Sequence, residues 1–147
     1  MLGSTMQSVQ VKSLKRSLDK ELIFETTFEG FSQEDLYQWP LGPGAFKRQN
    51  PPWNQAKLLS PHPGVFDGAK VSLRVNGFSW DLRHHDVIEN IQFCDSQTKG
   101  PFFSYTHLHK FLSGGRLRDE IRFSSIGSGF VERELRRVFK YRHEVLR

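Results

Sequence analysis

His107, His109 and Asp119 are the residues of this sequence whose types and spacing could support chemistry. The two histidines lie two positions apart in an alternating segment, so on a β-strand both side chains point to the same face. If a tight turn of about three residues at Gly114-Gly115 joins two antiparallel strands, the even register places His109 opposite Asp119. We therefore predict a cross-strand His109–Asp119 pair on the inner face of a sheet.

A histidine that is oriented by a carboxylate can move protons near neutral pH, so general acid–base chemistry is one interpretation of this pair. The simpler interpretation is that Asp119 only supplies the hydrogen bond that a buried imidazole needs. Burial would lower the pKa of such a histidine, and the carboxylate would raise it again. Both interpretations stay open, because the sequence shows no recognisable nucleophile or oxyanion-binding group beside the pair.

The rest of this predicted inner face is aromatic and apolar. Alternation places Tyr105 and Phe111 on the same face as the two histidines, and it places Leu117, Ile121 and Phe123 on the matching face of the next strand. Ligand pockets are mostly apolar and contain a few convergent polar groups. We therefore expect this sheet to line a covered pocket.

A metal site is the weaker interpretation of the histidines. The neighbouring residues His84 and His85 point to opposite faces of a strand, so at most one of them could join His107 and His109. The sequence has no cysteine pair and no helical histidine motif of the kind that holds zinc. We therefore expect neither a metal nor any other cofactor.

Composition favours an ordinary globular protein. The 147 residues fit one domain, and 37% of them are hydrophobic and 25% charged. Cys94 is the single cysteine, so no intramolecular disulfide can form, and we expect a reducing compartment, the cytoplasm. There is no run of about 18 apolar residues and no leader segment, so we expect no integral membrane association.

The net charge of +5 raises the possibility of an anionic partner. Much of the positive excess lies near the two ends, in the segment 12–16 (KSLKR) and in the last predicted helix, where glutamates of the same helix offset part of it. A basic surface for nucleic acid or anionic lipid would need four cationic side chains to form one uncompensated patch, namely Arg133, Arg136, Arg137 and Lys140. No recognised nucleic-acid-binding motif is present, so we expect no nucleic-acid partner.

The elements that must position these residues follow an α+β order. Residues 1–19 are predicted to be a flexible N-terminal extension, and residues 20–147 a single domain. A first strand is followed by two short helices, a further set of strands and a long C-terminal helix with a 3.6-residue apolar period. The predicted strands are 21–28, 53–59, 70–75, 78–88, 91–97, 102–112 and 117–123, and the predicted helices are 32–39, 45–49 and 130–146.

Five segments carry a family resemblance that covers roughly residues 24–146. The segments are 43–53 (PGAFKRQNPPW), 93–102 (FCDSQTKGPF), 105–111 (YTHLHKF), 117–121 (LRDEI) and 139–143 (FKYRH). These segments and the order of the predicted strands and helices resemble those of the START-like, or SRPBCC, superfamily. Gln49-Asn50 departs from the residues expected at these two positions. The resemblance implies a helix-grip fold, in which a curved antiparallel sheet of about six to seven strands surrounds the C-terminal helix.

The superfamily includes lipid and hormone carriers, aromatic polyketide cyclases and dehydratases, and oxygenase domains, so the fold alone does not select an activity. The subgroup that these motifs resemble also occurs as an N-terminal domain fused to an epimerase-like dehydrogenase. A separate dehydrogenase- or epimerase-like protein is therefore one partner that the resemblance implies. The sequence has no glycine-rich dinucleotide fingerprint, so no cofactor role is carried over.

We predict that the protein binds a hydrophobic or aromatic small molecule between the sheet and the C-terminal helix, as a carrier or as the partner of an enzyme. The alternative is a small cyclase or dehydratase, a lyase-like enzyme without metal, with His107, His109 and Asp119 as catalytic residues. Binding is favoured over catalysis. The candidate ligand-binding residues are Trp39, Phe46, Arg48, Trp53, Trp80, Phe102, Tyr105, Phe139 and Arg142, and the two arginines among them could receive a ligand carboxylate or phosphate.

Overall fold

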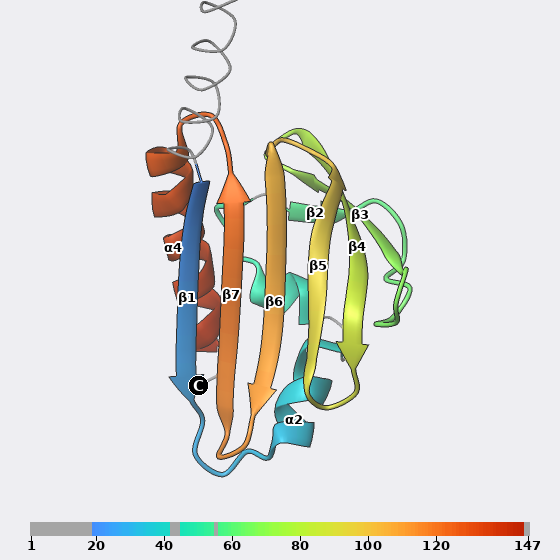
Figure 1. Ribbon diagram of the computed structural model, residues 1–147, viewed down its shortest axis with the longest axis vertical. Helices are drawn as coiled ribbons and strands as arrows, with labels where there is room; N and C mark the ends of the chain where they lie inside the picture. Colours follow the sequence, from blue (N-terminus) through green and yellow to red (C-terminus); the bar gives the residue numbers. More distant parts are fainter. Residues whose placement is uncertain (1–18, 42–44, 55, 146–147) are drawn as a thin grey trace, which may run out of the picture.

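Within residues 19–41, 45–54 and 56–145, which the computed structural model describes, seven strands form one antiparallel sheet in the order β1-β7-β6-β5-β4-β3-β2 (Figure 1). The strands β3 to β7 are neighbours in sequence order, β1 pairs with β7 at one edge, and β2 pairs with β3 at the other. The strands are β1 (Asp19–Thr27), β2 (Ala56–Leu58), β3 (Lys70–Val75), β4 (Phe78–Ile88), β5 (Gln92–Lys99), β6 (Ser104–Leu112) and β7 (Arg116–Ser124).

The hairpin between β3 and β4 turns at Asn76 and Gly77, whose φ angles are 49° and 85°. Both angles lie in the left-handed region, which Gly and Asn adopt with the least strain and which a two-residue type I′ turn requires. The hairpin predicted from the Asn-Gly pair is thereby confirmed. Its register determines which side chains of β4 face inward.

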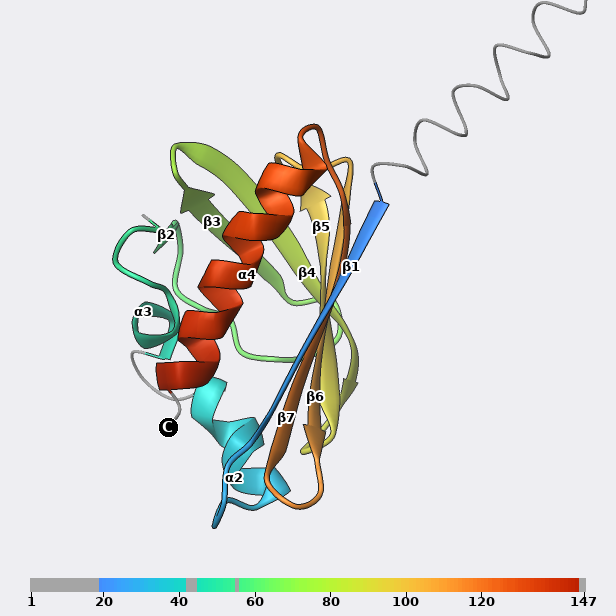
Figure 2. The ribbon, with the colours of Figure 1, turned by 90° about the vertical axis from the view of Figure 1, so that its left-hand side faces the viewer.

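The long helix α4 (Ser128–Val145) crosses one face of the sheet, as the edge-on view in Figure 2 shows. Its apolar stripe faces the strands: Phe139 stacks on Phe24 of β1 with the ring centroids 5.4 Å apart. Val131 and Leu135 of the same stripe pack against the core cluster that contains Phe139. Burial of each such side chain contributes roughly 1.5–3 kcal/mol, so packing rather than helix propensity holds α4 on the sheet.

Three short helices connect β1 to β2. They are α2 (Gln33–Gln38), the 3₁₀ turn η1 (Trp39–Leu41) and α3 (Ala45–Gln49). α2 begins with a capping box, in which Ser32 and Asp35 accept hydrogen bonds from each other's backbone N–H groups. Its buried residues Leu36 and Tyr37 belong to a second core cluster with Phe111 of β6. The inner face of the sheet is thus covered by α4 and, at one end, by α2.

The α+β helix-grip architecture predicted from the sequence is confirmed, with small differences at element boundaries. β1 begins at Asp19 rather than at Glu21, so residue 19 belongs to the sheet, while residues 1–18 lie outside the described part. β2 is three residues long, shorter than the predicted segment 53–59, because a turn with a hydrogen bond from Asn54 N–H to the Pro51 carbonyl precedes it. Among the described residues, no helix combines the length and apolar character that crossing a membrane would require.

Candidate functional site

A cavity of about 430 Å³ lies between the inner face of the sheet and α4. Its volume is within the usual range for sites that hold small molecules. The walls are mainly apolar, with aliphatic side chains from β3 and β4, aromatic side chains from β4, β6 and the segment before it, and the apolar stripe of α4. The polar lining residues include His62, His84, Asp95, Tyr105, His107, His109 and Arg142.

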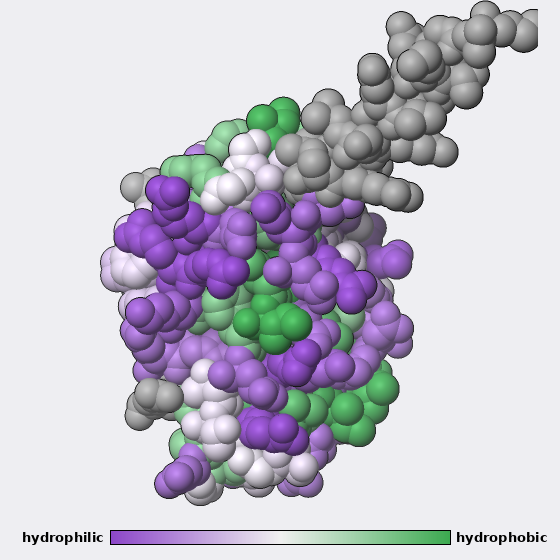
Figure 3. All heavy atoms as spheres, turned by 60° about the vertical axis from the view of Figure 1, so that its left-hand side comes forward, coloured by the Kyte–Doolittle hydropathy of each residue, from purple (hydrophilic) through white to green (hydrophobic). Residues whose placement is uncertain are grey.

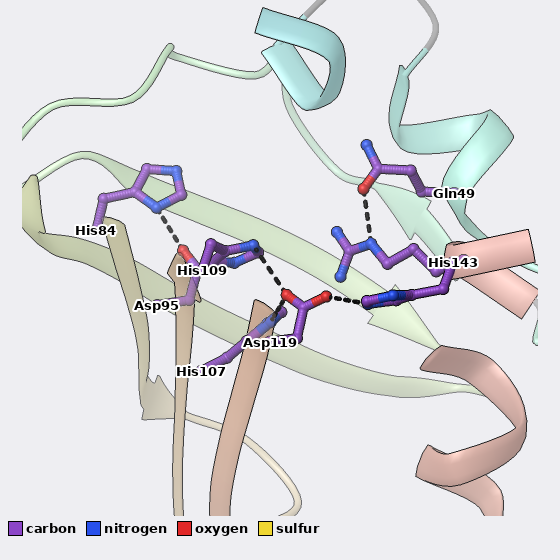
Figure 4. A network of polar contacts seen from close by, with 8 residues as sticks. Gln49, His84, Asp95, His107, His109, Asp119 and His143 are labelled. Atoms are coloured by element: carbon purple, nitrogen blue, oxygen red, sulfur yellow. Dashed lines mark hydrogen bonds and ion pairs between the residues drawn. The ribbon is translucent and has the colours of Figure 1, made fainter. Parts of the chain in front are cut away.

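Asp119 of β7 is the centre of a buried hydrogen-bond network beside this cavity (Figure 4). Its side chain is 2% exposed and accepts two hydrogen bonds, from His107 Nε2 to Oδ1 at 2.6 Å and from His143 Nε2 to Oδ2 at 2.7 Å. The other ring nitrogen of His143 accepts a hydrogen bond from the hydroxyl of Thr26 at 2.7 Å. Asp119 and its partners therefore connect β1, β6 and β7 to helix α4.

Asp95 of β5 is the centre of the second half of the network. His109 Nε2 donates to Asp95 Oδ2 at 2.8 Å, and His84 Nδ1 is in ion-pair contact with Asp95 Oδ1. The orientation of His84 does not satisfy hydrogen-bond geometry, and among the described residues its Nε2 has no partner at all. His109 Nδ1 lies 3.5 Å from Asp119 Oδ1, which brings the two halves into contact.

Both carboxylates are ionised in this environment. Burial alone would raise the pKa of each carboxyl, but the hydrogen bond from His109 and the close contact with His84 hold the pKa of Asp95 far below its usual value. The electrostatic interaction with His107 and the hydrogen bonds from His107 and His143 lower the pKa of Asp119 well below its usual range. Burial, together with the neighbouring His107, lowers the pKa of His109 to about 4, so this imidazole is neutral at neutral pH.

The polar groups at the cavity wall differ in what they can do chemically. Nε2 of His107 donates to Asp119, which leaves Nδ1 without a hydrogen-bond partner among the described residues and available as an acceptor. Burial raises the pKa of Tyr105, so its hydroxyl stays protonated and can donate. Nε of Arg142 donates to Oε1 of the buried Gln49 at 2.6 Å. The wall therefore offers one imidazole acceptor, one phenol and one oriented cation.

Among the described residues, two groups of side chains have the composition of a metal site. Asp95, His107 and His109 offer one atom each within 4.8 Å of one another, and Asp119 would orient His107 as a second partner. On the opposite face of the sheet, Cys94 lies near His85, but burial raises the pKa of its thiol to about 11, which disfavours the thiolate that binds metals. The first group could hold a cation: His109 Nε2 already donates to Asp95 Oδ2, but Asp95 Oδ1 has no well-formed hydrogen bond among the described residues.

The predicted register between β6 and β7 is confirmed: His109 is opposite Asp119, and His107 is opposite Ile121. The predicted side-chain pair needs correction, because His109 makes its close hydrogen bond with Asp95 and lies 3.5 Å from Asp119. The close partners of Asp119 are His107 and His143 instead. The reason is that β5, the neighbour of β6, supplies the carboxylate of Asp95 to His109, and that α4, which covers the sheet, supplies His143 to Asp119.

The structure brings most of the predicted site residues together. His107 and His109 line the cavity with five of the predicted ligand-binding residues, which are Trp80, Phe102, Tyr105, Phe139 and Arg142. Asp119 is buried behind His107 rather than at the wall.

Three further candidates lie away from the cavity. The Arg48 guanidinium lies 5.7 Å from the centroid of the Trp39 ring, and Trp53 packs edge-on against Tyr141 at 5.5 Å. The side chain of Phe46 is outside the described part of the chain. Trp39 and Trp53 therefore pack against side chains of α3 and of the C-terminal part of α4, respectively, rather than lining the cavity.

Sequence reasoning missed Asp95, His143 and Gln49. A signal existed for two of them. Asp95 alternates with Phe93 on the inward face of β5, and His143 follows Phe139 by four positions, which places both on one helix face. Gln49 could not have been found in this way, because its partner Arg142 is 93 positions away in the sequence.

No protein-family model matches this sequence, and no curated protein sequence matches it significantly. Solved structures do share its fold. The Mll3558 protein from Rhizobium loti is 12% identical, with a TM-score of 0.62 over 86% of this chain and 96% of its own. Ginseng major latex-like protein 151 from Panax ginseng is 14% identical, with a TM-score of 0.57 over 86% and 97%.

The di-domain ARO/CYC protein StfQ of the steffimycin biosynthetic pathway is 10% identical, with a TM-score of 0.62 over 91% of this chain and 51% of its own. At such low identity these likenesses establish the fold and leave the activity open.

Proposed function

We propose that this chain, which has the helix-grip fold of the START-like superfamily, binds one hydrophobic or aromatic small molecule between its sheet and α4, as a carrier or as the partner of an enzyme. The observation that carries the proposal is the cavity of about 430 Å³, whose apolar walls contain a few convergent polar groups. A site of this kind takes up an apolar molecule through burial of its surface and orients it through the polar groups.

Native mass spectrometry with two neutral probes, decan-1-ol and 2-naphthylmethanol, tests this proposal. The wild-type protein should form a 1:1 complex with at least one probe. Leu135→Trp, which adds volume to a side chain at the cavity wall, should abolish it. The matched control Ile23→Trp changes a half-exposed side chain that is not part of the wall and should leave binding intact. Equal binding by the wild type and Leu135→Trp, or no binding of either probe by the wild type, would overturn the proposal.

A second candidate function is supported by His107. Its Nε2 is hydrogen-bonded to the ionised Asp119, and its Nδ1, at the cavity wall, has no hydrogen-bond partner among the described residues, which is the arrangement of a general base. StfQ, which shares the fold, is named as an ARO/CYC protein. In a cyclisation, His107 would remove a proton from a carbon that lies between two carbonyl groups of the substrate. The resulting enolate carbon would attack a more distant carbonyl group of the same molecule, and the protonated His107 would return the proton to the new alkoxide. Loss of water would follow in a dehydratase.

The catalytic candidate is tested by the rate of ring closure of a poly-β-carbonyl substrate. His107→Gln should reduce the rate to that of the uncatalysed reaction, because the glutamine amide cannot take up the proton. The matched control His85→Gln alters a histidine on the opposite face of the sheet and should leave the rate unchanged. If His107→Gln, shown to be folded, retains the wild-type rate, His107 is not the base.

The basic-surface alternative is not favoured by the geometry of α4. Arg136 is paired with Glu132 at 3.0 Å and Arg137 with Glu134 at 3.4 Å, so two of the four required cations are compensated. Figure 3, which looks toward the side of α4 and β1, shows hydrophilic side chains surrounding a small group of hydrophobic ones. The dehydrogenase- or epimerase-like partner and the cytoplasmic location stay predictions.

A further inference from the structure

We infer that the ligand carries a single carboxylate that Arg142 receives, so that the ligand class is a hydrophobic or aromatic carboxylic acid. This inference rests on the proposed binding function and adds the chemistry of the ligand's polar end. It is carried by three features of the cavity: an arginine that has no acidic partner in the described part of the chain, the glutamine that orients this arginine, and the negative charge already present in the network.

Arg142 is the one lysine or arginine among the described residues that line the cavity. It forms no ion pair with a described acidic side chain. Glu134, an acidic residue of the same wall, is engaged by Arg137 at 3.4 Å. A guanidinium beside apolar walls without a carboxylate partner is costly unless an anion reaches it, because water solvates it less completely there. The ligand is the natural source of that anion.

Gln49 fixes the orientation of this guanidinium. Its Oε1 accepts from Arg142 Nε at 2.6 Å, and the Gln49 side chain is buried, with the residue 6% exposed. The ring of Phe139 lies beside the guanidinium, with its centroid 5.4 Å from Cζ. With Nε occupied, the two terminal amino groups remain as a fork, which matches the two oxygens of a carboxylate. Holding the fork in place before binding reduces the entropy lost when the ligand docks.

The charge already present near the cavity limits the anion to one negative charge. Asp95 and Asp119 are buried carboxylates of the network, and Asp95 lines the same cavity. A phosphate dianion would place two charges beside one cation and would be repelled by the nearby Asp95. A carboxylate is neutralised by Arg142 alone. The protonated hydroxyl of Tyr105 is close enough to feel the charge of Arg142 and can donate to the same anion.

Isothermal titration with two matched pairs of probes tests the inference: decanoic acid against decan-1-ol, and 2-naphthoic acid against 2-naphthylmethanol. We expect the wild-type protein to bind each acid at least about tenfold more tightly than its alcohol, because hydrogen bonds between charged groups contribute more to the free energy of binding than those to a neutral hydroxyl. Arg142→Gln should remove this preference, because it weakens the binding of the acids far more than the binding of the alcohols. The matched control Arg136→Gln removes one positive charge from an exposed position of the same helix and should keep the preference.

The outcomes separate this inference from the function on which it rests. Equal affinity of the wild type for acid and alcohol, or a preference that survives in Arg142→Gln, would overturn the carboxylate assignment and leave apolar binding intact. Failure of the wild type to bind any of the four probes would contradict the proposed function itself. If Arg142→Gln does not fold, Gln49→Leu decides: it keeps the guanidinium but frees its Nε, and an undiminished acid preference would then show that the fixed orientation is irrelevant.

Discussion

The two buried carboxylates of the network have different surroundings. Asp119 is 2% exposed, lies behind the cavity wall and accepts close hydrogen bonds from His107 and His143. Asp95 is 9% exposed, lines the cavity and has one well-formed hydrogen bond, from His109, because the contact with His84 is poorly oriented. The comparison indicates that Asp119 holds the sheet and α4 together, whereas Asp95 belongs to the part of the network that borders the ligand.

The largest expected effect separates the two carboxylates directly. Asp119→Asn should lower the free energy of unfolding by about 3–5 kcal/mol, because it removes a buried charge that two histidines surround. Asp95→Asn should cost less, since the cavity gives its neighbours access to water. Urea denaturation of both variants measures the difference. If Asp119→Asn were as stable as Asp95→Asn, the structural role assigned to Asp119 would be wrong.

Acid stability should depend on His109. Its pKa is lowered by burial to about 4 in the folded protein, against about 6.5 in an unfolded chain, so below pH 6.5 the unfolded state binds a proton that the folded state does not. Stability should therefore fall between about pH 6.5 and pH 4, by on the order of 3 kcal/mol. The low pKa values of Asp95 and Asp119 add a further loss at lower pH.

The matched variant for this prediction is His109→Gln, which cannot take up a proton in this range. Its free energy of unfolding should change much less than that of the wild type between pH 6.5 and pH 4, as measured by urea denaturation at each pH. The same slope in both proteins would show that another group titrates there.

Two histidines at opposite ends of the network provide a smaller contrast. His143→Ala should lower the free energy of unfolding by about 1–3 kcal/mol, because the buried Asp119 Oδ2 loses its donor. His84→Ala should cost less, since the imidazole of His84 makes no well-formed hydrogen bond among the described residues. Thermal unfolding of the two variants ranks them, and the reverse order would contradict the comparison.

The smallest effect is expected at Thr26. Thr26→Val keeps the shape of the side chain and removes the hydroxyl that donates to His143 Nδ1. A neutral, partly buried hydrogen bond contributes about 0.5–1.5 kcal/mol, so the melting temperature should fall by a few degrees. Thr27→Val, a change of the same type at the neighbouring position, is the control. An effect as large as that of Asp119→Asn would mean that the network depends on Thr26 far more than its geometry indicates.

Much of the fold was accessible from the sequence, because it is determined by local chemistry. The Asn76-Gly77 pair specifies its turn, and alternation in residues 105–111 and 117–123 specifies which side chains share a face. Register then followed from matching the apolar faces across the Gly114-Gly115 turn. These features need no knowledge of how distant elements dock.

The partners within the site were less accessible, because they depend on docking. The pairing of Asp95 with His109 requires the offset between β5 and β6, and the contact of His143 with Asp119 requires the rotation of α4 above the sheet. The bond between Gln49 and Arg142 joins α3 to α4, two elements whose mutual position no sequence period encodes. The correct residue types could be predicted at several of these positions, but their pairing could not.

The most direct test of the central claim is a crystal structure of the protein with 2-naphthoic acid. We predict that the naphthalene rings lie in the cavity between the sheet and α4, with the carboxylate within hydrogen-bond distance of the terminal amino groups of Arg142. An empty cavity in crystals grown at a saturating concentration of 2-naphthoic acid, or acid bound elsewhere on the surface, would contradict this prediction.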